Sequence, residues 1–280
     1  MGEPKDGRSK RGRAARPADK DKGRRAARRQ AGTAVDRSRP RRSSRGPGRA
    51  SDEKGRRRED VDAGERLLRA AGPLFADQGF DAVSTRALTR AAQVNLSAIT
   101  YHFGGKTGLY RAVLERLVAD LTPVRTALIE GLRRGVAAAG GDRRRLAEVL
   151  VGFVRLLLTV LTNPEVPLWG MRLIQRELHG PSEDFAVVME GHIEPIHEAV
   201  DELVAAATGR PVDDERTRIL AQSVVVECLQ VGFGRHLILS RLGWDAFTPE
   251  RIERVTEVVA AATLGMLGLP DPGSRTAGEP

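Results

Sequence analysis

The residues best suited to chemistry lie between Ser84 and Lys106, where hydroxyl, amide and cationic side chains stand near the starts of short helices. Ser97 and Thr100 can hydrogen-bond bases or phosphates, and Leu96 beside them can pack against a thymine methyl group. Lys106 is the only lysine after residue 60 and it opens a helix, where positive charge and free backbone amides together suit a phosphate oxygen. This combination of residue types indicates contact with nucleic acid.

Two short helices joined by a three-residue turn must position these side chains. The first is predicted from Thr85 to Ala92 with Ser84 as its N-cap, and the second from Leu96 to His102 with Asn95 as its cap. Such a pair is the helix-turn-helix pattern of proteins that place a helix in the major groove. The apolar anchors shared by the two helices are Leu88, Val94 and Ile99.

The rest of the chain after residue 60 also has helical periodicity, and no stretch alternates apolar and polar residues as a half-buried strand would. The fold class predicted is therefore all-α. Inside the first helix, Gly72-Pro73 conflicts with the pattern and predicts a kink, and Pro123 predicts a bend in the long helix that begins at Lys106. The other predicted helices are 60–77, 142–162, 165–178, 182–207, 213–242 and 248–267.

Charge is concentrated at the N-terminus of this 280-residue chain. Residues 1–60 hold 22 Lys and Arg against 9 Asp and Glu, a balance of +13, whereas the remaining residues hold 24 against 28, a balance of −4. The same 60 residues contain no Leu, Ile, Phe, Tyr or Trp, so they cannot bury enough apolar surface to offset the entropy of ordering. We expect a disordered tail over 1–57, which either attracts phosphates without regard to sequence or has no dedicated role.

Motifs of enzymes and metal sites are missing from the sequence. It has no Gly-rich phosphate loop, no nucleophile elbow and no paired cysteines. His192 and His197 are five residues apart and fall on different helix faces, whereas a helical pair of metal ligands prefers a spacing of three or four. We expect neither an enzyme nor a bound metal or cofactor.

Compartment and membrane association are also constrained. Cys228 is the single cysteine, so no intramolecular disulfide can form, and its apolar surroundings predict a buried, inert thiol. The most apolar stretch, 149–161, is interrupted by Arg155 and is shorter than the ~20 residues needed to span a bilayer. We expect a cytoplasmic bacterial protein that joins the nucleoid when bound to DNA and has no membrane partner.

Residues 67–110 resemble the N-terminal domain of the TetR family of transcriptional regulators. The resemblance rests on LLRAA at 67–71, on Gly79-Phe80, and on the block VNLSAITYHFGGKTGLY at 94–110. This block looks like one branch of the family, whose members have a CecR-like (CerR-like) C-terminal domain, and Arg176-Glu177-Leu178 followed by Pro181-Ser182 supports that branch. Two positions depart from the pattern: Gln93 replaces the usual Gly, and Thr100 stands where other members have Asn or Tyr.

The resemblance implies a domain plan and a set of DNA contacts. It predicts a three-helix DNA-binding domain over 58–105, an all-helical dimerisation and ligand-binding domain over 106–270, and a disordered C-terminus over 271–280. The reading face would run from Asn95 to Thr100, with Tyr101 and His102 on phosphates. The residues predicted to bind DNA are Ser84, Arg86, Asn95, Leu96, Ser97, Thr100, Tyr101, His102 and Lys106.

The C-terminal two-thirds would form a homodimer and bind an unknown small-molecule effector, as in the family. The last two helices fit a four-helix dimer interface, predicted to contain Val224, Cys228, Ile252, Val255, Val259 and Met266. A mixture of apolar walls and a few polar groups suits a ligand pocket. The residues predicted to line it are Phe153, Trp169, Met171, Arg172, Gln175, Phe233 and His236, although the same side chains would also serve as ordinary helical core.

The function predicted is that of a repressor bound to a palindromic double-stranded operator and released by its ligand. A dimer carries two recognition helices about one DNA turn apart, which read a near-palindrome together. Two alternatives remain open from the sequence: an activator using the same fold, and a non-specific DNA-organising protein driven by the basic tail.

Overall fold

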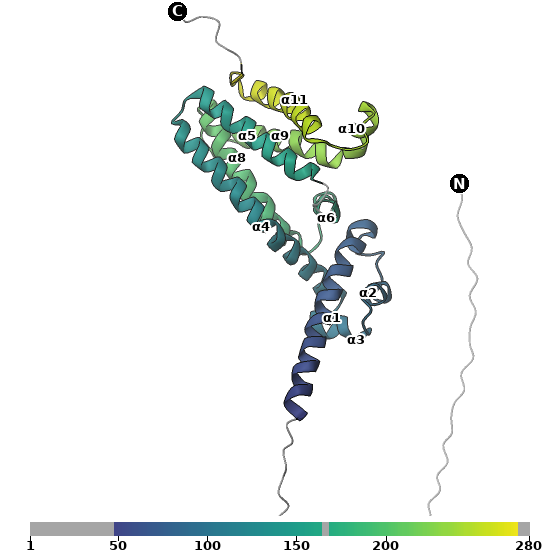
Figure 1. Ribbon diagram of the computed structural model, residues 1–280. Helices are drawn as coiled ribbons and strands as arrows, with labels where there is room; N and C mark the ends of the chain where they lie inside the picture. Colours follow the sequence, from purple (N-terminus) through teal and green to yellow (C-terminus); the bar gives the residue numbers. More distant parts are fainter. Residues whose placement is uncertain (1–47, 164–167, 274–280) are drawn as a thin grey trace, which may run out of the picture. The chain divides into compact units, whose positions relative to one another are not determined.

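In the computed structural model, residues 48–163 and 168–273 are described, and helices are the only regular elements among them (Figure 1). The expected disordered ends lie partly outside these residues, over 1–47 and 274–280. In chain order the helices are α1 (Gly48–Gln78), α2 (Thr85–Ala92), α3 (Ser97–Phe103), α4 (Lys106–Ala139), α5 (Arg143–Thr162), α6 (Leu168–His179), α7 (Phe185–Val188), the π-helical turn η1 (Met189–Ile193), α8 (Glu194–Thr208), α9 (Glu215–Phe233), α10 (Arg235–Leu242) and α11 (Pro249–Leu267).

The first helix begins earlier than predicted. Residues 48–57, assigned to the disordered tail from their lack of apolar side chains, form the first turns of α1. Arg, Glu, Ala and Lys are good helix formers, so a helix already nucleated by its later, packed part can extend back through them. As predicted, the helix ends at Gly79, which has a φ of 84°.

The helix-turn-helix follows the prediction closely, with one correction. Ser84 caps α2 by accepting a hydrogen bond from the Ala87 amide at 3.1 Å. The second helix begins at Ser97, and Asn95 does not cap it through its side chain; instead the Asn95 carbonyl accepts from the Ala98 amide. The turn is therefore closed by the backbone.

Two predicted helices of the C-terminal part are interrupted. The segment predicted as 182–207 divides into α7, η1 and α8, because the turn at 189–193 is widened to a π-helix. The segment predicted as 213–242 breaks at Gly234, which separates α9 from α10. Amphipathic periodicity continues across both interruptions, which is why it does not reveal them.

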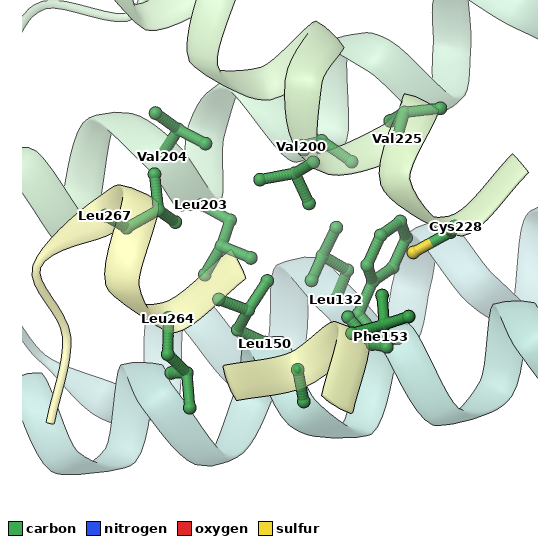
Figure 2. Packing of buried hydrophobic residues seen from close by; sticks show 14 of the residues in the cluster. Leu132, Leu150, Phe153, Val200, Leu203, Val204, Val225, Cys228, Leu264 and Leu267 are labelled. Atoms are coloured by element: carbon green, nitrogen blue, oxygen red, sulfur yellow. The ribbon is translucent and has the colours of Figure 1, made fainter. Parts of the chain in front are cut away.

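Buried apolar side chains form two clusters, and α4 contributes to both. Its first third, including Leu109 and Leu117, packs with α1, α2 and α3, while Leu128 and Leu132 pack with α5, α8, α9 and α11. Figure 2 shows the second cluster, where Phe153 and Cys228 point into the same part of the core. A boundary at residue 106 therefore does not separate the two cores.

Helix α6 belongs to the first cluster although it lies far along the chain. Leu173 is fully buried there, and the Trp169 ring lies so close to α1 that a Cβ at Gly72 would come within 2.8 Å of it. This close approach gives a reason for the glycine that conflicted with the helical pattern. A larger residue at position 72 would push α6 away from α1.

Gly72→Ala tests this packing. Alanine favours helix by about 1 kcal/mol, but the overlap with Trp169 should reverse the sign and destabilise the protein by roughly 1–3 kcal/mol in urea unfolding. Gly152→Ala is the matched control, since it is also helical and a Cβ there meets nothing within 4 Å. The control should gain about 0.5–1 kcal/mol. Equal gains at both positions would contradict the proposed contact.

Candidate nucleic-acid interface

A depression on the surface of the helix-turn-helix gathers several of the predicted DNA contacts. It is formed by the middle of α1, the end of α2, the turn and α3. The residues lining it are Ala63, Arg66, Thr89, Arg90, Gln93, Val94, Asn95, Ser97, Ala98, Tyr101 and His102.

Helix α3 presents one buried and one exposed face. Ile99 is 2% exposed and packs into the first cluster, whereas Leu96 and Tyr101 are 54% and 74% exposed. Ser97 and Thr100 are exposed with them, and Asn95 precedes them in the turn. Side chains of these kinds, grouped on one helix face, suit contacts with base edges and phosphates in a major groove.

The other predicted contacts surround α3. The His102 ring is half-buried and lies against α1, where a Cβ on Gly64 would be 3.5 Å from its Nδ1. Lys106 directs its Nζ to the Asp81 carbonyl at 3.4 Å and lies 4.3 Å from the centre of the Phe80 ring. Ser84 and Arg86 are exposed at the start of α2.

Two arginines of this surface were missed by the sequence analysis. Arg66 donates from Nε to the Ala92 carbonyl at 3.2 Å and pairs with Asp62, so it ties α1 to the last residue of α2. Arg90 is exposed in the depression and makes no ion pair with any residue that the structure describes. Helical periodicity marks both as solvent-facing but does not say which lies beside α3.

Helix α6 is bound to the C-terminal end of α1 by charged hydrogen bonds. The Arg176 guanidinium donates to the carbonyls of Ala76 at 2.6 Å and Asp77 at 2.8 Å, groups that lack partners within the helix. Arg172 forms an ion pair with the Asp77 carboxylate. The macrodipole favours cations at this end of a helix, so both arginines stabilise the contact.

A buried carboxylate joins α6 to α4. Glu177 is 2% exposed, and its two oxygens accept hydrogen bonds from the Tyr110 hydroxyl, the Ser182 amide at 3.1 Å and the Ser182 hydroxyl at 2.8 Å. Burial, followed by the hydrogen bond to Glu177, raises the pKa of Tyr110 well above its ordinary value, so the hydroxyl stays a proton donor. The carboxylate therefore has donors from α4 and from the loop after α6.

The predicted pocket residues are divided among different contacts. Phe153 is buried in the second cluster, Met171 packs against that cluster near Gly232, and Trp169 packs against α1 in the first. Arg172 and Gln175 line a shallow open depression between α1 and α6, together with Ala76, Asp77, Arg176 and His179. Phe233 is half-buried and His236 is exposed. Among the described residues, these seven side chains do not line one common cavity.

Three of the six predicted dimer residues are turned inward. Val224 and Cys228 are fully buried within this chain and Val259 is 7% exposed, so none of the three can present its side chain to a second copy. Burial also raises the pKa of the Cys228 thiol to about 12, which makes it unreactive. Ile252 and Val255 are half-buried against the second cluster, and Met266 is exposed.

Metal binding and membrane crossing are not supported by residues 48–163 and 168–273. In these segments, no group of three or more His, Cys, Asp and Glu side chains lies close enough together to hold a metal ion. None of their helices is both long and apolar enough to cross a membrane.

Two segments of the chain match known protein families. Residues 67–113 match the family described as "Bacterial regulatory proteins, tetR family". Residues 146–268 match the family described as "HTH-type transcriptional dual regulator CecR, C-terminal domain".

Individual proteins are also similar to this chain. It is 30% identical over 197 residues to the HTH-type transcriptional dual regulator CecR of Shigella flexneri, covering 70% of this chain and 87% of that protein. It is 26% identical to the HTH-type transcriptional activator FasR of Mycolicibacterium smegmatis, covering 57% of this chain and 65% of that protein. A crystal structure of a putative TetR-family regulator from Mesorhizobium loti superimposes with a TM-score of 0.45 at 16% identity, covering 74% and 96% of the two chains.

The two tyrosines of the chain provide a matched test of the buried carboxylate. Tyr110→Phe leaves Glu177 short of one donor in a buried site and should lower the free energy of unfolding by about 1–3 kcal/mol. Tyr101→Phe removes the same hydroxyl from an exposed position and should change stability by no more than about 0.5 kcal/mol. Chemical denaturation of both variants measures the difference, and equal stability of the two would argue against the Tyr110–Glu177 contact.

Proposed function

Since this chain belongs to the TetR family of bacterial regulatory proteins and has its CecR-type C-terminal domain, we propose that it is a repressor that binds a palindromic operator as a homodimer and is released by a small molecule. The observation that carries the proposal is the exposed face of α3, where Leu96, Ser97, Thr100 and Tyr101 stand together in water beside arginines of α1 and α2. This face has the width and chemistry of a helix that enters the major groove.

Each part of the face has a defined role in this proposal. Ser97 and Thr100 hydrogen-bond base edges, and Leu96 contacts a thymine methyl group. Tyr101 and Arg90 bind phosphates on either side of α3, while Arg66 holds α2 in place. His102 packs against α1 and orients Tyr101, whose ring centre is 4.9 Å from its own. Lys106 and Arg86 extend the phosphate contacts beyond the groove.

The homodimer forms through outward faces of α9 and α11, on which the three buried residues of the prediction, Val224, Cys228 and Val259, do not lie. Ile219 and Val226 are 57% and 45% exposed on α9, and Val258 is 71% exposed on α11. Val258 shares its stripe with the small exposed residues Ala261, Ala262 and Gly265, which would let the backbones of two copies approach closely. Met266, the one predicted residue that is exposed, lies at the end of the same helix.

The effector acts through α6 in this proposal. Helix α6 packs on α1 through Trp169 near its start and Arg176 near its end. The carboxylate of Glu177 connects it to α4, which continues into the second cluster. A ligand that binds better when α6 is displaced would shift the two recognition helices away from the spacing that fits the operator. The position of α6 between the two clusters supports this route.

Whether this protein represses or activates depends on the position of its operator. The relatives include one named as a dual regulator and one named as an activator. The same helix-turn-helix represses or activates according to where its operator lies relative to the promoter. A reporter fused to the upstream region, with the gene present and deleted, decides between them: derepression on deletion supports a repressor, and loss of expression supports the activator alternative.

The basic tail favours a second candidate, a protein that organises DNA without reading sequence. Residues 1–47 carry 17 Lys and Arg against 5 Asp and Glu. Such a segment gives binding that depends strongly on salt and little on sequence. In a specific regulator the tail would add to the affinity for DNA. In a DNA-organising protein it would supply most of that affinity.

Deletion of residues 1–47 separates the two functions and leaves α1 intact. Binding to the DNA upstream of the gene and to scrambled DNA is measured by fluorescence anisotropy at several salt concentrations. A specific regulator should retain binding in the range of about 10⁻⁸–10⁻¹¹ M and a preference of 10³-fold or more for its own site, with a shallower salt dependence. Equal affinity for both DNAs, lost on deletion, would instead assign the binding to the tail.

Val258→Glu tests the dimer face. A carboxylate placed opposite its own symmetry mate in an apolar interface is desolvated and repelled, so the variant should be monomeric at concentrations where the parent protein is dimeric. Val212→Glu, also at an exposed valine but between α8 and α9, is the control and should stay dimeric. Sedimentation velocity measures both, and a dimeric Val258→Glu protein would place the interface elsewhere.

A further inference from the structure

The turn that precedes α3 contains a residue in an unfavourable backbone conformation. Gln93 has a φ of 55° and a ψ of 47°, the left-handed region in which a Cβ crowds the following carbonyl. Its amide closes the end of α2 by bonding to the carbonyls of Arg90 and Thr89, so the turn requires this conformation. Glycine would adopt it without the steric cost.

The rest of the chain uses glycine at such positions. Of the described residues with positive φ, Gln93 is the one that is not glycine; α1, α3, α4, α8, α10 and α11 are each followed by a glycine in this region. Residue 93 therefore adopts the left-handed conformation with a steric cost that the glycines at the other helix ends avoid.

Contacts within the protein do not explain why a glutamine occupies position 93. Gln93 is exposed, and its side-chain amide makes no hydrogen bond to the residues that the structure describes. It covers no buried cluster. A side chain that strains its turn and stabilises nothing inside the protein has its role, on physical grounds, outside it.

The surroundings of Gln93 indicate what it contacts. It lies in the depression with Arg90 of α2, Asn95 of the turn, and Ser97 and Tyr101 of α3. A glutamine amide offers two N–H donors and is one of the side chains that bind phosphate oxygens beside a recognition helix. The turn precedes the helix that would read the bases, so its side chain reaches the flank of the groove.

We propose that Gln93 is a DNA-contacting residue whose side-chain amide donates to the phosphate backbone beside α3, and that this contact is why a strained glutamine occupies the turn. The inference rests on the proposed function, because it assumes that α3 enters the major groove. It adds a contact from the turn to those expected from α3 itself.

Gln93→Gly separates stability from binding, because the two should move in opposite directions. Removing the strain should raise the midpoint of thermal unfolding by roughly 2–4 °C. Removing the amide should weaken operator binding about three- to tenfold, the size of one hydrogen bond. Because glutamine is neutral, the slope of log affinity against log salt should not change. Unchanged affinity in the stabilised variant would overturn the proposal.

Gln93→Lys distinguishes a contact from an effect on turn geometry. A lysine beside a phosphate should make the salt slope steeper by about one per bound protomer. Gln78→Lys is the matched control: Gln78 is also exposed and directly precedes the left-handed Gly79. It lies 14 residues, or about 21 Å, along α1 from Gly64, which packs against the His102 ring of α3. Equal slopes for the two lysine variants would show that residue 93 does not face the backbone.

The same measurements distinguish this proposal from the proposed function. If the parent protein does not prefer its own upstream DNA, the function fails before any variant is tested. If it does, a panel of single base-pair changes in the operator is bound by the parent protein and by Gln93→Gly. A uniform loss across the panel supports a backbone contact, whereas a loss confined to one base pair overturns it in favour of base reading.

Discussion

The side chain of Glu177 is almost completely buried, and neighbouring groups donate hydrogen bonds to both of its carboxylate oxygens. A buried carboxylate without donors would cost several kcal/mol, so the Tyr110 hydroxyl and both donors of Ser182 must stay within reach. That requirement holds α4, α6 and the loop after α6 in one arrangement. The neighbouring Arg176 then reaches the free carbonyls at the end of α1, and Gly72 allows Trp169 to approach the same helix.

This constraint changes how the chain divides. By sequence, the DNA-binding part ends before α4 and everything after it senses and dimerises. In the structure the first cluster includes the start of α4 together with Leu173 and Val188, from helices α6 and α7 that lie far along the chain. The second cluster begins further along α4. A displacement of α6 must therefore disturb the packing of the helix-turn-helix itself, and this is how the proposed effector would change the affinity for DNA.

The surface proposed to read DNA is built differently from the interior that supports it. Ile99 anchors α3, and the residues around it on the opposite face are left exposed, with Tyr101 as the extreme case. Gln93 likewise has a structural backbone and an exposed side chain. Its backbone amide caps the end of α2, while its side chain is exposed to solvent. The identity of residues on such a surface depends on what they bind and not on packing within the protein. Packing rules therefore detect them only as residues that break those rules.

The sequence by itself determined the local features of this protein. Caps, glycine ends and apolar spacing located most helix ends to within a few residues, but not the start of α1 or the breaks at 189–193 and Gly234. The starts at Asp142 and Thr248 were among those located, and both side chains accept hydrogen bonds from the first turns of α5 and α11. These signals are local because each involves groups within one helical turn. The helix-turn-helix could be predicted for the same reason, and the resemblance to the TetR family then indicated which residues of α3 would contact DNA.

Only the tertiary structure decided which apolar faces are covered and by what. Val224 and Cys228 have the periodicity of an interface, yet α9 turns them into this chain's own core and leaves Ile219 and Val226 outside. Glu177 and Trp169 give no sign in the sequence of their contacts with Tyr110 and Gly72, which lie 67 and 97 positions away. Periodicity states that one side of a helix is apolar; the partner of that side depends on contacts between residues distant in the chain, which no local pattern encodes.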